Sequence, residues 1–90
     1  MTSMEAILCE DIPERTTIRA IIRDASVLTG IPVPDIIGHK RTKEFVRVRQ
    51  AVMWEARRQG YSLPQIGRAL NRDHTTVIHG LRQVERRRQS

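Results

Sequence analysis

Apolar residues recur along most of the chain at the spacing of one helix face. Beyond residue 14 they fall three, four, seven and ten positions after the first, and Gly30 and Pro32 follow them. A glycine just beyond the last turn, with a proline after it, is typical of a helix C-terminus. The pattern therefore predicts a helix over residues 14–29. Its apolar stripe consists of Ile18, Ile21, Ile22, Ala25 and Leu28.

The middle of the chain carries a short turn, a basic loop and a second long stripe. Pro34 precedes Asp-Ile-Ile-Gly, which predicts a single helical turn with proline near its start. Residues 39–43, HKRTK, form the basic loop. The next stripe predicts a helix over residues 43–59, ended by Gly60. Its members are Phe45, Val48, Val52 and Ala56, widened by Val46 and Met53.

Residues 62–89 hold two further stripes with a tight turn at Asn71-Arg72 between them. Ser62 is placed as the N-cap of the first, short helix. A short helix, a tight turn and a longer helix predict a helix-turn-helix. The chain is therefore expected to be all-α, with about four to five helices. The two stripes are Leu63, Ile66 and Leu70, with Gly67 beside them, and then Val77, Ile78, Leu81 and Val84.

Two residues of the last helix make specific structural predictions. Asp73 is expected to be its N-cap, with the carboxylate accepting from the N–H of Thr75 or Thr76. Gly80 lies inside the helix, where glycine costs about 1 kcal/mol relative to alanine. A neighbour packed closely against Gly80 would explain its use there.

The first residues differ from the rest of the chain. Residues 1–13, MTSMEAILCEDIP, form an acidic and weakly apolar leader, which Pro13 separates from the first stripe. We therefore divide the chain into a leader, 1–13, and a helix-turn-helix domain, 14–90. The leader is expected to be disordered or to bind a partner, either another protein or a second copy of the chain.

Charge directs the search for a ligand. The chain holds 16 Lys plus Arg against 10 Asp plus Glu, a net charge of +6. Residues 1–14 contain four acids and no base, so the positive charge lies in the remainder, and all but two of its bases are arginine. A basic domain of this kind predicts a polyanionic partner, with nucleic acid first among the candidates. Arginine suits bidentate contacts with phosphate and guanine.

Other functional classes lack support in the sequence. The lone Cys9 excludes an internal disulfide and a cysteine-based zinc site, and His74 and His79 are five apart rather than the four of a zinc pair. No apolar run is long enough to cross a membrane, and no secretory signal is visible. The chain has no G-x-x-x-x-G-K-[ST] phosphate loop and no catalytic constellation. We expect no enzyme activity, cofactor, metal, nucleotide or membrane, and a cytoplasmic, nucleoid-associated location.

The residues that open the last helix are polar and are not needed for its apolar stripe. In a helix-turn-helix, the N-terminal residues of the second helix reach base edges in the major groove. Here they are His74, Thr75 and Thr76, flanked by Arg72 and Asp73. Threonine can donate, accept and offer a methyl to thymine, and aspartate can accept from cytosine N4. A capping role alone remains the alternative for Asp73.

Residues 62–79, SLPQIGRALNRDHTTVIH, closely resemble the signature of the C-terminal DNA-binding domain of the bacterial replication initiator DnaA. GIPVPDIIG at 30–38 and RTKEFVRVRQ at 41–50 resemble its first connection, short helix, basic loop and long helix. The resemblance covers roughly residues 14–88. It implies a small Trp-repressor-like helical fold and double-stranded DNA as the partner, at DnaA boxes such as TTATCCACA.

The resemblance also implies roles by position. Arg72, Asp73, His74, Thr75 and Thr76 match the residues that read bases in the major groove, and Arg41 matches an arginine that enters the minor groove. Reading both grooves implies some bending of the DNA. The residues expected to hold the DNA backbone are Thr42, Lys43, Arg47, Arg49, Gln50, Arg57, Leu63, Pro64, His79 and Arg82.

Some positions depart from the family pattern. The turn Leu70-Asn71-Arg72 stands where the family usually has a glycine pair, and Glu44 adds an acid near the basic loop. An initiator also carries an ATP-binding module ahead of this domain, and these 90 residues contain none. Such changes leave the base-reading residues intact.

Two functional hypotheses follow. The first is sequence-specific binding of double-stranded DNA at DnaA-box-like sites without an ATPase module, regulating replication initiation or transcription. The alternative is a protein-interaction module that acts through residues 1–13, with DNA contact secondary. The sequence does not separate replication from transcription, activation from repression, or monomer from dimer.

Overall fold

The computed structural model describes residues 16–89, which form five helices and no strand. The predicted all-helical fold with a helix-turn-helix is confirmed. The leader, 1–13, lies outside the described residues. The helices are α2 (Ile18–Thr29), α3 (Val33–Ile37), α4 (Lys43–Arg58), α5 (Leu63–Ala69) and α6 (His74–Gln89).

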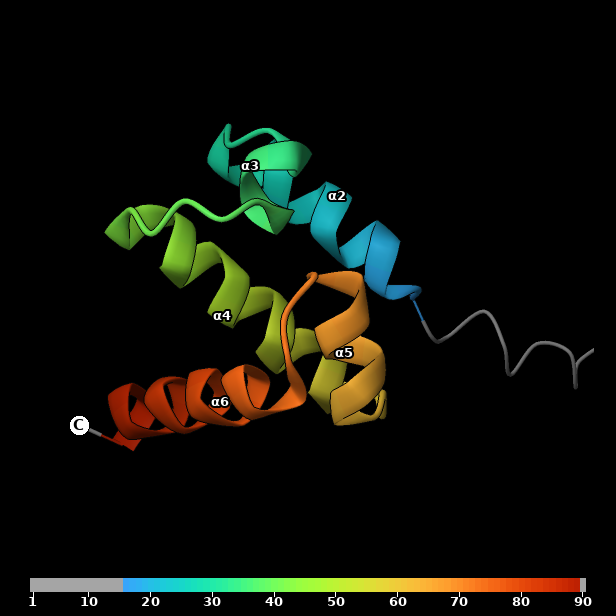
Figure 1. The fold of residues 1–90 in the computed structure, drawn as a ribbon, viewed down its shortest axis with the longest axis vertical. Helices are drawn as coiled ribbons and strands as arrows, with labels where there is room; N and C mark the ends of the chain where they lie inside the picture. The colour runs from blue at the N-terminus through green and yellow to red at the C-terminus, as the bar shows by residue number, and fades with distance from the viewer. Residues whose placement is uncertain (1–15, 90) are drawn as a thin grey trace, which may run out of the picture.

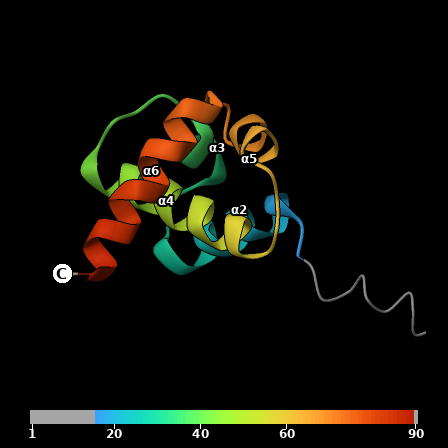
Figure 2. The ribbon, with the colours of Figure 1, turned by 90° about the horizontal axis from the view of Figure 1, so that it is seen from below.

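Helix α4 is the centre of the domain, because it packs against each of the other four helices. Figure 1 shows α2 and α3 on one side of it and α6 on the other, with α5 at its end. Figure 2 shows the same neighbours from below, with α6 lying across α4. The helix-turn-helix α5–α6 is thus supported by α4 from behind.

Local capping sets the limits of α2. The Thr17 hydroxyl accepts from the Ala20 N–H at 3.1 Å, so the helix begins at Ile18, later than the predicted residue 14. Gly30 ends it as predicted, with a left-handed φ of 79° and its N–H bonded to the Ser26 carbonyl at 2.8 Å. A left-handed residue at this position satisfies carbonyls that the last turn leaves open.

The short helix α5 begins with a capping box. The Ser62 hydroxyl accepts from the Gln65 N–H at 3.2 Å, and the Gln65 side chain accepts from the Ser62 N–H at 2.9 Å. The predicted N-cap is therefore confirmed. Pro64 in the first turn adds a fixed φ where no intrahelical N–H bond is lost. These contacts define the start of a helix that is too short to be stable alone.

The core is aliphatic, as the scarcity of aromatic residues requires. In one respect the predicted stripes were wrong: Leu28 is 85% exposed, and its neighbour Val27 is 77% exposed. The buried residues of α2 lie in its first two turns, and its last turn extends beyond the core. The buried hydrophobic residues are Ile18, Ile21, Ile22, Ile36, Val48, Val52, Met53, Ala56, Ile66, Leu70 and Val77.

No helix within residues 16–89 is both long and apolar enough to pass through a bilayer.

Two hydrogen bonds hold the start of the described chain beside the C-terminal end of α4. The Thr16 N–H donates to Gln59 Oε1 at 2.7 Å, and the Tyr61 hydroxyl donates to the Thr16 carbonyl at 2.8 Å. The start of the described chain is therefore tied to the connection between α4 and α5.

Two buried glycines lie where helices approach closely. A methyl group on Gly67 would stand 2.6 Å from the backbone carbonyl oxygen of Arg72, in the turn before α6. A methyl group on Gly80 would stand 2.5 Å from Sδ of Met53, on α4. The predicted close neighbour of Gly80 is therefore confirmed as a methionine side chain.

These two glycines give a matched pair of variants. Both lie within helices, so each alanine gains the same intrinsic helix propensity, about 1 kcal/mol. Gly67→Ala meets backbone that must shift, whereas Gly80→Ala meets the end of a flexible side chain. We expect Gly67→Ala to lower the free energy of unfolding by about 1–3 kcal/mol more than Gly80→Ala does. Urea denaturation followed by circular dichroism measures this, and equal stabilities would contradict the packing argument.

Candidate nucleic-acid interface

The turn between α5 and α6 is closed by its own backbone. The Leu70 N–H donates to the Ile66 carbonyl at 3.0 Å, and the Arg72 N–H donates to the Gly67 carbonyl at 2.7 Å. Between them Asn71 has a φ of +60°. Asparagine tolerates this left-handed region better than most residues other than glycine. Asn71 thus makes the turn possible without the glycine pair that is usual in the family.

Asp73 caps α6, but through a different bond from the predicted one. Its carboxylate accepts from the His74 N–H at 3.0 Å, not from Thr75 or Thr76. The Thr76 N–H instead bonds the Asp73 backbone carbonyl at 3.0 Å. Asp73 Oδ1 also lies 3.5 Å from Nδ1 of His74. The cap therefore joins two of the predicted base-reading residues, Asp73 and His74, to each other.

The first turn of α6 faces solvent on its polar side. Asp73 and His74 keep 72% and 56% of their side-chain surface exposed, and Thr75 and Thr76 are exposed as well. Val77, the next residue, is fully buried. The helix is therefore anchored by its apolar stripe while these polar side chains remain open to a ligand.

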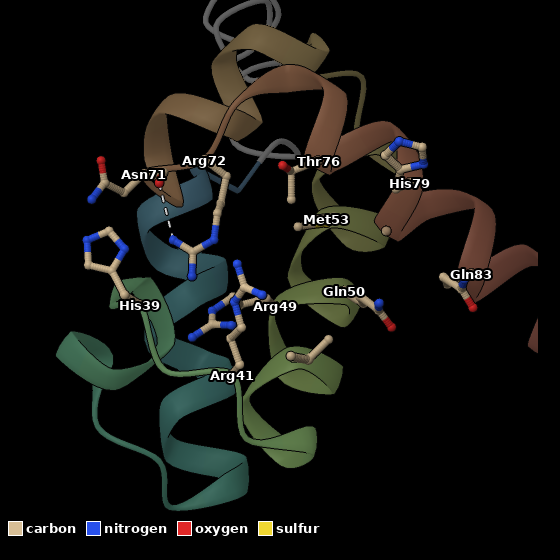
Figure 3. Close-up of a pocket in the computed structure, with 12 residues that line it drawn as sticks. His39, Arg41, Arg49, Gln50, Met53, Asn71, Arg72, Thr76, His79 and Gln83 are labelled. Carbon is tan, nitrogen blue, oxygen red and sulfur yellow. Dashed lines mark hydrogen bonds between the residues drawn. The ribbon is translucent and has the colours of Figure 1, made fainter.

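Residues 38–42 join α3 to α4 and contain most of the predicted basic loop, whose last residue, Lys43, begins α4. This connection, the basic loop, reaches the same side of the molecule. It borders a hollow of about 600 Å³ with the turn before α6 and the facing sides of α4 and α6 (Figure 3). Six predicted DNA-contacting residues line this hollow, and no aspartate or glutamate of residues 16–89 does. The six residues are Arg41, Arg49, Gln50, Arg72, Thr76 and His79.

The remaining predicted contacts are placed around the hollow or beyond it. Asp73, His74 and Thr75 lie at the start of α6 without lining it. The predicted backbone contacts outside it are exposed, apart from the half-buried Leu63. These outer contacts are Thr42, Lys43, Arg47, Arg57, Leu63, Pro64 and Arg82.

Sequence reasoning missed three polar residues of the hollow. His39 lies in the basic loop and Asn71 in the turn, and both border it. Gln83 follows His79 by four residues on α6, so helical spacing alone places the two on one face. That spacing was the signal available in the sequence.

Arg49 is buried, with 4% of its surface exposed, although it belongs to the predicted backbone contacts. Its Nε donates to the Ile36 carbonyl at 2.6 Å, and its Nη2 donates to the carbonyls of Gly38 and Lys40 at 3.1 and 2.6 Å. Burial first, and the nearby charge of Arg72 second, lower the pKa of this guanidinium from its usual value. Arg49 therefore fastens the basic loop to α4 from inside the protein.

Other cations of the region also hold the fold. Arg57 Nη1 donates to the Tyr61 carbonyl at 2.8 Å. Near the end of α6, Arg87 Nη2 donates to Gln50 Oε1 at 2.9 Å, and the Arg88 guanidinium lies 4.8 Å from the centre of the Trp54 ring.

Within residues 16–89, no three His, Cys, Asp or Glu side chains form a group that could hold a metal ion.

The chain matches the family described as "Bacterial dnaA protein helix-turn-helix" over residues 18–84. It belongs to this family. The region matched is its non-catalytic, DNA-binding part, and the ATPase region of the initiators is not covered. No solved structure matches the chain significantly.

Curated relatives agree with the family. The chromosomal replication initiator protein DnaA of Ruegeria sp. (strain TM1040) is 42% identical over 73 residues, which are 79% of this chain and 16% of that protein. The protein of the same name from Caulobacter sp. (strain K31) is 40% identical over 74 residues, 80% of this chain and 15% of that protein. The chain thus spans about a sixth of the length of these relatives.

The burial of Arg49 predicts a large effect on stability. Arg49→Met removes the donor of one buried and several part-buried carbonyls, and we expect it to lower the free energy of unfolding by about 2–4 kcal/mol. Arg47→Met, an exposed position on the same helix, is the control, with an expected change within about 0.5 kcal/mol. Urea denaturation of both variants measures the difference. Equal stability would show that the guanidinium does not hold the loop.

Proposed function

We propose that this chain, as a member of the DnaA helix-turn-helix family, binds double-stranded DNA sequence-specifically at DnaA-box-like sites. The observation that carries the proposal is the exposed, polar start of α6, formed by the capping residue Asp73 and the first helical residues 74–76, beside the basic loop with Arg41. A base-reading helix and a second cationic element on one side of a small domain suit the two grooves of one duplex.

The first turn of α6 supplies the chemistry for reading base edges. Thr75 and Thr76 each offer a hydroxyl and a methyl, which suit a purine edge or a thymine. Asp73 accepts hydrogen bonds as an anion, and it pairs with His74 through the cap. In our proposal the cap fixes the direction of both side chains before DNA arrives. This preorganisation reduces the entropy lost on binding.

The basic loop supplies the second contact. Arg41 is exposed and borders the hollow, whose lining includes no carboxylate of residues 16–89. We propose that Arg41 enters the minor groove next to the major-groove site of α6. Arginine is favoured in narrow, A·T-rich minor grooves because their negative potential is enhanced. The A·T-rich start of TTATCCACA would offer such a groove.

Charge gives the interface its affinity for any duplex. The lining of the hollow contains three arginines, Arg41, Arg49 and Arg72, and no acid from the part of the chain that the structure describes. Other exposed cations of α4 and α6 are Lys43, Arg47 and Arg82. Contacts of the exposed cations with phosphates would position the protein but carry no sequence information. They therefore set the salt dependence of binding, while α6 and Arg41 set the preference.

The proposed role is regulatory and needs no ATP. By occupying DnaA-box-like sites, the domain would compete with a full initiator or act at promoters that contain such sites. The relatives are named chromosomal replication initiators, and what they share with this chain is the helix-turn-helix region. A location on the nucleoid in the cytoplasm follows from DNA as the partner.

The first experiment is a fluorescence-anisotropy titration near 150 mM salt. Equal-length duplexes carry TTATCCACA, a scrambled box or a random sequence. A preference of about 10³-fold for the box is the expected result, as for specific binders generally. Equal, salt-sensitive binding to all three duplexes would refute sequence-specific recognition of this box.

Substitutions separate the two kinds of contact. Thr75→Ala is expected to cost about 1–3 kcal/mol on the box and to relax specificity, because it removes a contact with a base edge. Arg47→Ala is expected to weaken all duplexes about equally and to reduce the salt slope by about one, since it removes one phosphate contact. Titrations of both variants against box and random DNA test this. Equal losses on both duplexes for Thr75→Ala would remove it from the base-reading residues.

A further inference from the structure

We propose that Arg72 is a positioning residue, not a reader of bases: it ties the basic loop to the turn before α6. It would thereby set the spacing between Arg41 and the first turn of α6. The inference rests on the proposed DNA binding, and it replaces the base-reading role that the family resemblance implies for Arg72.

The guanidinium of Arg72 bridges two parts of the backbone. On the turn, Nη1 donates to the carbonyls of Leu70 and Asn71 at 3.1 and 3.2 Å. At the end of α3, Nη1 lies 3.5 Å from the Ile37 carbonyl, and Nη2 donates to the Gly38 carbonyl. Figure 3 shows this side chain extending from the turn toward the loop, with Arg49 and Arg41 beneath it. Segments more than thirty positions apart in sequence are joined by one side chain.

These bonds compete with base reading. An arginine that reads guanine presents two N–H groups side by side to O6 and N7. In Arg72 both terminal nitrogens already donate to protein carbonyls. A bidentate contact with a base would require at least some of those bonds to break, and would take this donor from part-buried carbonyls such as that of Leu70, which costs free energy. The side chain itself is only partly exposed, unlike its neighbours Asp73 to Thr76.

Apart from the two arginines, the side-chain contacts of the loop are those of Lys40, whose Nζ lies 4.0 Å from Asp35 Oδ1 and 5.9 Å from the centre of the Phe45 ring. His39, Lys40, Arg41 and Thr42 are all exposed, so apolar packing does not hold them. Arg49 fastens the loop to α4 through the carbonyls of Gly38 and Lys40. Arg72 fastens it to the helix-turn-helix through the same Gly38 carbonyl, which accepts from both arginines. The two guanidiniums thus connect the loop with the two elements that must stay in register with it.

This arrangement makes a specific prediction about coupling. If Arg72 acts through the loop, removing it harms mainly what Arg41 contributes. Once Arg41 is gone, the further loss of Arg72 should matter little for recognition. If Arg72 instead reads its own base pair, the two losses are independent and their fold-changes multiply.

The test is a double-mutant cycle on the full 90-residue chain. Arg72→Met, Arg41→Ala and the double variant are titrated against the box, and against boxes altered either in the A·T-rich end or in the CCA part. We expect each single variant to lose about tenfold on the intact box, and the double variant to lose less than about threefold beyond Arg41→Ala. We also expect Arg72→Met to lose discrimination at the A·T-rich end and keep it in the CCA part.

Two further variants separate positioning from charge. Arg72→Lys keeps the positive charge but cannot bridge both segments with a planar fork, so we expect it to bind almost as poorly as Arg72→Met. Recovery in Arg72→Lys would mean that Arg72 serves only as a charge for phosphate. Arg23→Met, an exposed arginine on α2 away from the hollow, controls for the loss of one charge. If Arg72→Met does not fold, Arg72→Lys carries the same cycle.

The outcomes for the inference and for the proposed function are distinct. Multiplying losses, with discrimination lost at one pair of the CCA part, would overturn positioning and restore base reading. A wild-type chain without preference for the box would instead overturn the proposed function. In that case the positioning role of Arg72 is tested without DNA, by comparing the amide chemical shifts of the wild-type chain and Arg72→Met in NMR spectra. Arg72→Met should shift residues 38–42 while α2 stays unchanged, and an unchanged loop would overturn the inference.

Discussion

The interface depends on one constraint: a polar loop without an apolar anchor has carbonyl groups that must be satisfied. Arg49 meets this from α4, with its side chain almost fully buried and bonded to carbonyls at Ile36, Gly38 and Lys40. An unpaired buried carbonyl is costly, so the position of the guanidinium and the course of the loop fix each other. Because α4 also packs against every other helix, the bonds of Arg49 fix the position of this loop relative to the centre of the fold.

The backbone of the turn between α5 and α6 depends on residues with particular local properties. Gly67 leaves room for the Arg72 carbonyl, and Asn71 takes the left-handed conformation that turns the chain. Asp73 then caps α6 through the His74 N–H. Each of these residues acts on backbone within a few positions, so the turn is specified locally, whereas its place relative to the basic loop depends on Arg72.

The difference between local and long-range effects explains what could be predicted. Helices α2 to α6 follow from apolar spacing, and their ends from Gly30 and Ser62, because those signals act within a few residues. The prediction that Leu28 belongs to the buried stripe of α2 was wrong, because the spacing of apolar residues identifies a helix face but not how far the core extends along that face. The interior bonds of Arg49 and Arg72 were beyond sequence reasoning, since arginines in a basic chain give no sign of which carbonyls they meet. The candidate site was identified by motif and resemblance, and its internal connections only by the structure.

The choice of acceptors has a consequence for function. A guanidinium held by a carboxylate forms a neutral pair, which would cancel its attraction for a polyanion. Arg49 and Arg72 are held by neutral backbone carbonyls, so neither charge is cancelled by its hydrogen-bond acceptors, and no acid among the described residues lines the hollow. The cost is repulsion between the two cations, which contributes to the lowered pKa of Arg49. A phosphate backbone nearby would relieve that repulsion, so the bonds that position the loop also favour the proposed partner.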